Sequence, residues 1–205
     1  ENYKCNAGSA RCFLKMNGDD TGDNISDLAK YFSELSVQYW AWKNVDADYY
    51  GLCHYRRYLS FSDKRYKNTV FNMVRELKLT PHEKKKYHLD DTKKIEKTVK
   101  QYDMIIPVVA KASEMSYNRA EVKTLREMWE SYNGVYFEQG IIDKMFSLIK
   151  EYSPEYYNSA CEYFSGKYHR AFNCYIMKKE LFVRMCEFQF PIMKRITEIT
   201  DCKTY

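Results

Sequence analysis

The sequence contains few of the residues that interrupt secondary structure, with 7 glycines and 4 prolines in 205 residues. This composition excludes collagen-like and low-complexity chains, and no linker rich in Pro, Gly or Ser and no internal repeat divides the chain. No stretch approaches the ~20 consecutive apolar residues of a membrane span, and no charged-then-apolar signal opens the chain. At this length we expect one folded domain with a large core.

Paired-cysteine motifs are also missing. The seven cysteines form no CxxC pair, and their odd number leaves no complete disulfide framework. A reducing cytoplasm suits this pattern best. Because Cys53 and His54 are adjacent, alternation along a strand would point them to opposite faces, which argues against a structural zinc site. We therefore expect a soluble cytoplasmic protein, with peripheral contact at the inner face of the membrane as a further location.

Charges are nearly balanced, whereas aromatic residues are abundant. Lys and Arg number 33 against 28 Asp and Glu, and the formal charge of +5 favours anionic partners only weakly. Aromatic residues make up 17% of the chain and include 20 tyrosines. Tyrosine combines apolar faces with a polar tip and suits sugar or nucleobase surfaces, although a tyrosine-rich core explains the same composition.

Apolar periodicity predicts the elements of the first part of the chain. The stretch 17–25, rich in Gly and Asp, is expected to be a loop. An amphipathic helix follows, with an apolar stripe from Leu28 to Trp42 and Ser26 as its N-cap. A buried strand over 49–55 then runs directly into two arginines.

The same patterns predict an alternation of helices and strands in the rest of the chain. Such alternation indicates an α/β sandwich with a small, partly parallel sheet. Pro107 indicates an edge position or a strand end, and Pro191 should break or kink the last helix. The expected elements are helices over 67–77 and near 95–102 (capped by Asp90 or Asp91), a buried strand over 104–110, helices near 119–132, 137–151 and 154–165, a strand over 172–177 and a helix from Lys178.

The segment His54-Tyr55-Arg56-Arg57 stands where the first strand should end, and ligands of open α/β sheets gather at strand ends. Arginine offers a planar fork of donors that matches phosphate geometry, and histidine adds a hydrogen-bonding group, so the segment is suited to bind a diphosphate. If the strand persists, His54 and Arg56 share one face while Tyr55 and Arg57 share the other. The alternative is that these arginines pair with acidic residues such as those of the 19–23 loop.

Five segments, taken in order, carry a family resemblance: GDDTGDNIS (18–26), YFSELSVQYWAWKN (31–44), DADYYGLCHYRRYL (46–59), YDMIIP (102–107) and FNCYIMKKELF (172–182). Over most of its length the chain resembles a family of bacterial domains of unknown function described as capsular or exopolysaccharide biosynthesis proteins. The resemblance implies a glycosyltransferase-A-like sandwich, with a small mixed sheet flanked by several helices. It also implies a nucleotide-diphosphate sugar donor and an acceptor that is a growing surface glycan or its lipid-linked precursor.

Carried over position by position, the resemblance singles out candidates for catalysis and for donor binding. An inverting transfer needs a carboxylate base, so Asp20, Asp23 or Glu34 is assigned to the acceptor hydroxyl or the donor sugar. His54 is either that base or a group that orients the diphosphate. One of the two arginines is assigned to the donor diphosphate, where leaving-group charge develops. The donor-binding candidates are Asn24, Trp40, Lys43, Tyr55, Arg56, Arg57 and Asn173.

Two features depart from the family's pattern. Many nucleotide-sugar transferases hold a divalent cation, Mn or Mg, with an Asp-x-Asp at a strand end. Here Asp46-Ala47-Asp48 precedes the strand, so we interpret it as a turn, and arginine is an alternative to the metal. The residues ahead of Gly18 match poorly where a strand and a loop with His and Lys are expected. We therefore expect a glycosyltransferase-like domain over 1–205 that lacks its N-terminal strand, and one that is inactive alone if that strand carries part of the nucleotide pocket.

Two other classes of function stay open. A non-catalytic module that binds glycans or nucleotides would keep the aromatic and arginine surface without activity. A nucleic-acid-binding protein would need a continuous basic face, which a charge of +5 does not favour, and the lysine-rich stretch 84–100 is typical of a solvated surface. The expected partners are a nucleotide-sugar donor and a glycan or lipid-linked acceptor, with no nucleic acid.

Overall fold

The computed structural model describes residues 18–66, 71–170 and 172–200, and the contacts divide the chain into two units, Glu1–Asp46 and Ala47–Tyr205. The single domain expected over 1–205 stays a prediction. No helix in the described ranges has both the length and the apolar character that crossing a membrane requires.

The described part of the Glu1–Asp46 unit, residues 18–46, consists of a loop followed by short helices. Residues 18–25 form turns and bends, as predicted. The predicted amphipathic helix is interrupted at Ser33, whose φ of 48° lies outside the helical range. The Ser36 hydroxyl donates to the Asp19 carboxylate, and the Ser36 backbone N–H donates to the Ser33 carbonyl at 3.2 Å and so satisfies a backbone group at the break. Ser26 is therefore no N-cap of a long helix; the helices are η1 (Ser26–Leu28), α1 (Ala29–Phe32) and α2 (Leu35–Asn44).

The Ala47–Tyr205 unit contains a three-stranded sheet with the order β1-β5-β2, so the strand that comes last in the sequence lies in the middle. Both neighbours run antiparallel to it, and Tyr50 pairs with Met177 while Ile105 pairs with Ile176. A second, two-stranded sheet is also antiparallel. The strands are β1 (Tyr49–Leu52), β2 (Met104–Ile105), β3 (Ala110–Lys111), β4 (Tyr168–His169) and β5 (Tyr175–Lys178).

The prediction of a mixed, partly parallel sheet is therefore wrong for the described strands. Alternating strands and helices favour two strands with the same direction, and β1 and β2 do run the same way. They do not pair, because β5 lies between them. The buried strands predicted over 49–55 and 104–110 are also too long, and Pro107 follows the end of β2, as expected.

The buried face of the sheet packs on α8 (Lys179–Ile199). Tyr175 and Met177 of β5 are buried, and the residues that alternate with them are half-buried. Tyr50 stacks on Phe182 of α8, with ring centroids 4.1 Å apart and an interplanar angle of 4°. Because Phe182 is only 2% exposed, this stack fixes the start of α8 against β1 and β5.

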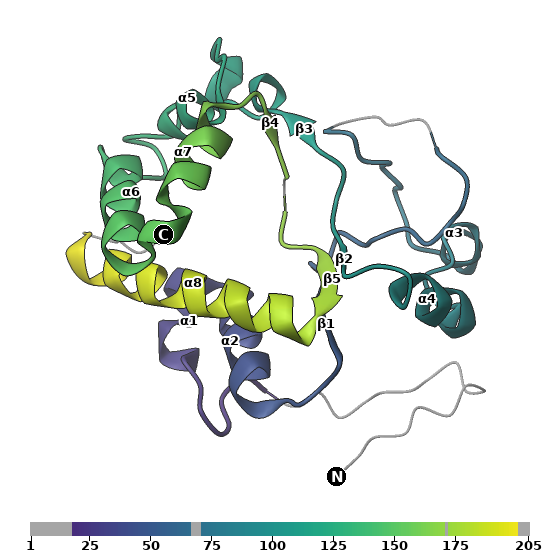
Figure 1. Ribbon diagram of the computed structural model, residues 1–205. Helices are drawn as coiled ribbons and strands as arrows, with labels where there is room; N and C mark the ends of the chain where they lie inside the picture. The colour runs from purple at the N-terminus through teal and green to yellow at the C-terminus, as the bar shows by residue number, and fades with distance from the viewer. Residues whose placement is uncertain (1–17, 67–70, 171, 201–205) are drawn as a thin grey trace. The chain divides into compact units, whose positions relative to one another are not determined.

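Helix α8 extends from the sheet to α6, as Figure 1 shows. Leu148 and Ile149 of α6 form a buried cluster with Ile192 of α8. The helix continues through Pro191, so of the predicted break or kink the break is wrong and the kink stays a prediction. Phe190 and Ile192 on either side are buried, and their burial offsets the backbone hydrogen bond that proline cannot make. The other elements of this part are η2 (Ala112–Glu114), η3 (Tyr117–Arg119), α5 (Leu125–Glu130), α6 (Ile141–Tyr152), η4 (Pro154–Tyr156) and α7 (Tyr157–Ser165).

The long connection from β1 to β2 contains two short helices, α3 (Pro81–Lys86) and α4 (Thr92–Val99). The start of α4 confirms the predicted cap, since the Asp91 carboxylate accepts the Lys94 N–H at 3.1 Å. A capping box between Thr80 and Glu83 begins α3.

The helix predicted over 67–77 does not form in its described part. Residues 67–70 lie outside the described residues. Phe71 and Asn72 have φ values of 51° and 60°, and a right-handed helix requires negative φ. The apolar residues whose spacing predicted this helix lie instead in an irregular part of the connection from β1 to β2.

Candidate functional site

The segment His54–Arg57 forms a tight turn directly beyond β1. The Arg57 N–H donates to the His54 carbonyl at 3.0 Å, which closes a four-residue turn. Strand β1 ends at Leu52, the residue that pairs with the first residue of β5. The predicted alternation of faces therefore does not apply, and Arg57 Nη1 instead lies 3.3 Å from His54 Nδ1.

Arg57 is held by an aromatic side chain from the other end of the sequence. Its guanidinium group lies over Phe172, with the Cζ atom 3.9 Å from the ring centroid. The Cys174 thiol lies 3.9 Å from the Arg57 carbonyl oxygen. Asn173 stands between these two contact residues, so the fold brings a third predicted segment to the turn. No described carboxylate of this unit forms an ion pair with Arg57, and the Phe172 ring orients its guanidinium. Pairing of the arginines with the 19–23 loop stays a prediction.

Tyr55 and Arg56 form the outer part of the turn. The Tyr55 side chain is 71% exposed, and the Arg56 guanidinium lies over its ring at 4.5 Å. The His54 ring is also close, with its centroid 4.3 Å from that of Tyr55. In the described part of this unit Arg56 has no ion-pair partner either, so the turn combines the exposed Arg56 with the half-buried Arg57 and His54.

The contacts of His54 indicate which ring nitrogen carries the proton. Its Nδ1 atom faces two donors, the Arg57 Nη1 at 3.3 Å and the Arg56 backbone N–H at 3.4 Å. A neutral imidazole whose Nδ1 accepts carries its hydrogen on Nε2. In this arrangement His54 offers an N–H donor to a ligand, which suits orientation of an anion better than removal of a proton.

Two cysteines meet beside the turn, a pairing that the sequence analysis missed. The register that pairs Leu52 with Tyr175 continues to Cys53 opposite Cys174. The Cys174 thiol hydrogen-bonds the Cys53 sulfur and, with the backbone N–H of Leu59, lowers the pKa of Cys53 to about 7, although partial burial opposes the shift. The same hydrogen bond raises the pKa of Cys174. The cross-strand position was not readable before the partner strand of Cys53 was known.

We expect Cys53 to react with iodoacetamide at neutral pH. The thiolate is the reactive form, so a pKa of about 7 predicts a rate that rises through pH 7 and levels off above it. In Cys174→Ala the hydrogen bond is lost and the midpoint should move up toward the ordinary range of cysteine. Peptide-resolved mass spectrometry measures the alkylation rate against pH. An unchanged midpoint in Cys174→Ala would contradict the assignment, and Cys161→Ala is the control.

In the Glu1–Asp46 unit the acidic loop is fastened to α2. The Tyr39 hydroxyl donates to the Asp23 carboxylate at 3.2 Å, and burial together with this carboxylate raises the pKa of Tyr39. Asn44 donates to the Asp23 carbonyl at 2.7 Å and accepts the Asp23 N–H at 3.1 Å. Gly22 has a φ of 60°, and a Cβ there would lie 2.1 Å from Asn44 Oδ1, so glycine is required.

Several predicted donor-binding residues have structural partners in this unit. The Trp40 indole donates to the Thr21 carbonyl at 2.8 Å, and the Asn24 amide donates to the Gly22 carbonyl at 3.0 Å. The Lys43 ammonium lies 3.6 Å from the Trp42 ring centroid. The first two contacts hold Trp40 and Asn24 to the loop, whereas Lys43 contacts its helix neighbour, and the role of all three in donor binding stays a prediction.

The predicted carboxylates differ in how they are engaged. Asp20 is exposed and its carboxylate makes no hydrogen bond with the described residues, which leaves both oxygens available to a ligand. Asp23 accepts from Tyr39 through one oxygen. Glu34 immediately precedes α2 but does not cap it with its side chain. Which of the three acts as the base stays a prediction.

The Asp-x-Asp spacing lies in an irregular segment before β1, as predicted. The Asp48 carbonyl accepts the Lys179 N–H at 2.9 Å and so joins the loop to the start of α8. Within the ranges that the structure describes, His, Cys, Asp and Glu side chains form no group of three or more that could hold a metal ion.

His169 is a structural histidine in β4. Its ring meets Trp129 edge-on, with centroids 5.9 Å apart, and burial lowers its pKa. Both features favour a neutral core side chain rather than a ligand-binding group.

The described architecture is a mixed α/β fold with small sheets and several helices, and it matches a solved glycosyltransferase. The structure of the bifunctional glycosyltransferase WbbM in its apo state aligns with a TM-score of 0.80 and 27% sequence identity over 92% of this chain. The chain spans 32% of the length of that protein. No curated protein matches the sequence.

The family of the chain follows from its sequence. The family model described as Domain of unknown function (DUF4422) matches residues 4–205, which is nearly the whole length. The chain therefore belongs to the DUF4422 family.

Proposed function

We propose that this chain is a glycosyltransferase domain that transfers a sugar from a nucleoside-diphosphate donor, and that the His54–Arg57 turn binds the diphosphate. The observation that carries the proposal is Arg57, whose guanidinium is fixed over Phe172 and has no carboxylate partner in the described part of its unit. The likeness to one part of a bifunctional glycosyltransferase supports the reaction class. The proposal includes a glycosyltransferase-A-like arrangement of the sheet and helices.

The turn offers the groups that such a reaction needs at its leaving group. When the bond between the anomeric carbon and the diphosphate oxygen breaks, negative charge builds up on the nucleoside diphosphate. Cations and N–H donors that are already oriented stabilise this charge without reorganisation. Arg57 and Arg56 supply two guanidinium forks, and His54 supplies an Nε2–H donor.

A carboxylate removes the proton from the acceptor hydroxyl in this proposal. Asp20 is our first candidate because its carboxylate is exposed and makes no hydrogen bond with the described residues. Asp23 and Glu34 remain the other candidates. A role as base predicts that Asp20→Asn abolishes transfer while nucleotide binding stays unchanged.

Arg56 and Arg57 are the alternative to a metal ion as the cation that neutralises the donor diphosphate. The carboxylates of the described residues do not gather into a cluster for Mn or Mg, so no step is assigned to a metal ion. The guanidinium groups take over charge neutralisation at the diphosphate. For the acceptor we propose a capsular or exopolysaccharide glycan or its lipid-linked precursor, reached at the cytoplasmic face of the membrane.

A thermal-shift screen tests the proposed function. The purified chain is heated with nucleoside diphosphates and a panel of nucleotide sugars, with and without manganese, because a ligand of the folded state raises the apparent melting temperature. We expect one nucleotide series to raise it without manganese. Release of nucleoside diphosphate on addition of a glycan acceptor then separates an enzyme from a non-catalytic binding module. Absence of any nucleotide-dependent shift would contradict the proposal.

A further inference from the structure

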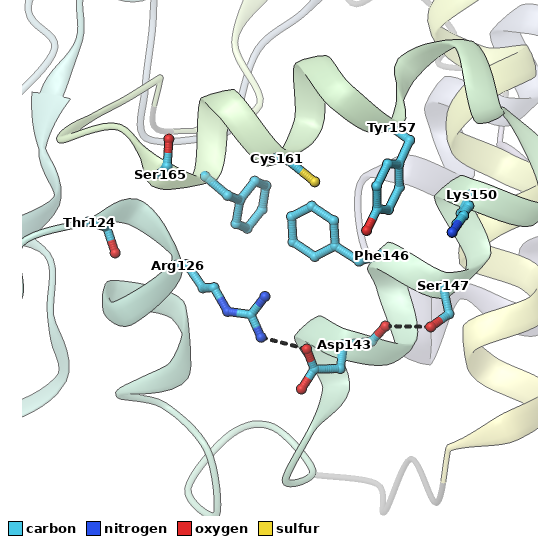
Figure 2. A pocket seen from close by; sticks show the side chains of 10 residues that line it. Thr124, Arg126, Asp143, Phe146, Ser147, Lys150, Tyr157, Cys161 and Ser165 are labelled. Carbon is cyan, nitrogen blue, oxygen red and sulfur yellow. Dashed lines mark hydrogen bonds and ion pairs between the residues drawn. The ribbon is translucent and has the colours of Figure 1, made fainter.

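A pocket of about 520 Å³ lies between α5, α6 and α7, and no residue of the His54–Arg57 turn lines it. Its size falls in the range of about 300–1,000 Å³ that is typical of small-molecule sites. Figure 2 shows Phe146 in the middle of the pocket, with Tyr157 and Lys150 to one side and Arg126 to the other. Nothing in the proposed transfer chemistry uses these side chains.

Three aromatic rings form the apolar wall of the pocket. Phe146 meets Phe164 edge-on with centroids 5.2 Å apart, and it meets Tyr157 in the same way at 6.2 Å. Phe146 is 8% exposed, whereas Tyr157 and Phe164 are half-buried and supply the more accessible part of this wall. The C–H face of a pyranose ring is apolar and packs well on such a surface, whereas its hydroxyls need polar groups around the rim.

Hydroxyl groups around this wall are arranged to accept hydrogen bonds. The Ser147 hydroxyl donates to the Asp143 carbonyl at 2.9 Å, and the Ser165 hydroxyl donates to the Glu162 carbonyl at 2.8 Å. Because the hydrogen of each serine is already used, its oxygen has acceptor capacity left for a ligand. A ligand rich in O–H donors, as a saccharide is, suits this rim.

The two cations of the pocket differ in their partners. Arg126 donates to Glu130 at 2.7 Å and to Asp143 at 2.5 Å, so its charge is compensated. Lys150 has no ion-pair partner among the residues that the structure describes, and its ammonium lies 5.5 Å from the Tyr157 ring centroid. The pocket therefore combines an aromatic wall with one uncompensated cation at its edge (Figure 2).

We propose that this pocket binds an acidic saccharide, with a hexuronic acid ring on the Phe146–Tyr157 wall and its carboxylate on Lys150. That this saccharide belongs to the acceptor glycan rests on the proposed function; the binding itself does not. The pocket would then hold the acceptor at a place separate from the residues that bind the diphosphate.

The test compares two disaccharides that differ by one carboxylate, cellobiouronic acid and cellobiose, by calorimetric or NMR titration of the purified chain. We expect cellobiouronic acid to bind about tenfold more tightly than cellobiose, because its carboxylate gains one charge-assisted hydrogen bond from Lys150. Lys150→Ala should reduce its affinity to that of cellobiose, whereas Lys150→Arg should keep the preference. Lys100→Ala, an exposed lysine that does not line the pocket, should change nothing. Tyr157→Leu should weaken both ligands.

Several outcomes would overturn the proposal. Equal affinity of the two disaccharides, no binding of either one, or an effect of Lys150→Ala that Lys100→Ala reproduces would each do so. Inorganic phosphate that binds as tightly as the acid and displaces it would identify a general anion site and not a saccharide site. The titrations contain no nucleotide, so the failure of the proposed transferase activity would leave their result unaffected.

Discussion

Replacing Arg57 by alanine is expected to reduce the rate of sugar transfer on the order of 100- to 1,000-fold, the loss typical of removing one fixed group that stabilises developing charge. The effect should fall on kcat more than on KM, because the charge on the leaving diphosphate is larger in the transition state than in the bound donor. Arg57→Lys should not restore the rate, since an ammonium lacks the planar fork that lies over Phe172. Release of nucleoside diphosphate from the donor that the thermal-shift screen identifies provides the measurement.

Folding controls separate this loss from a structural defect. The stack of Arg57 on Phe172 should contribute only about 0.5–1 kcal/mol to the free energy of unfolding, so Arg57→Ala should stay folded. Arg65→Ala is the matched control, because Arg65 is exposed and makes no contact with the turn. Transfer by Arg57→Ala at the rate of Arg65→Ala would remove the His54–Arg57 turn from the donor site.

Replacing Phe182 by alanine is expected to lower the free energy of unfolding by about 3–5 kcal/mol, the usual loss when a buried aromatic side chain leaves a cavity. Phe182 is 2% exposed and stacks on Tyr50 at 4.1 Å, and its ring also lies 6.4 Å from that of Tyr175. One substitution therefore removes contacts to β1 and β5 together. Urea titration followed by circular dichroism measures the change.

An exposed aromatic residue provides the comparison for Phe182. Tyr152 is 45% exposed at the end of α6, so Tyr152→Ala should change the free energy of unfolding by no more than about 0.5 kcal/mol. If Phe182→Ala cost no more than Tyr152→Ala, the stack on Tyr50 would not hold α8 to the sheet.

The elements that were predicted correctly are those that local interactions determine. The cap of α4 depends on Asp91 and Lys94, which are three residues apart. The turns of residues 18–25 depend on Gly and on side chains that bond to the nearby backbone, as Asn24 does. Both signals are present in a short window of sequence, so no distant contact is needed to read them.

The elements that were predicted wrongly have two causes. Some depend on backbone conformations that the pattern of apolar residues does not report, and others depend on contacts with distant parts of the chain. The helix expected over 67–77 fails at Phe71 and Asn72, and the helix expected to Trp42 breaks at Ser33, because their backbone takes positive φ. The continuity of α8 through Pro191 depends on the burial of its neighbours. Hydrophobic spacing reports which side chains are apolar but not whether the backbone between them stays helical.

The sequence by itself determined the composition of the candidate site. It placed two arginines, a histidine and a tyrosine at the end of a strand, because strand ends and turns have local signatures. It also determined membership of the family, which depends on the order of residues alone.

Only the tertiary structure decided how these groups are oriented. It placed β5 beside β1, which brings Phe172 and Cys174 to the turn and fixes Arg57 and the pKa of Cys53. It also assembled the pocket between α5, α6 and α7. These contacts join residues more than a hundred positions apart, and they depend on the order of the strands in the sheet. The free energy that determines the strand order comes from burial of the whole core, which no short segment of sequence contains.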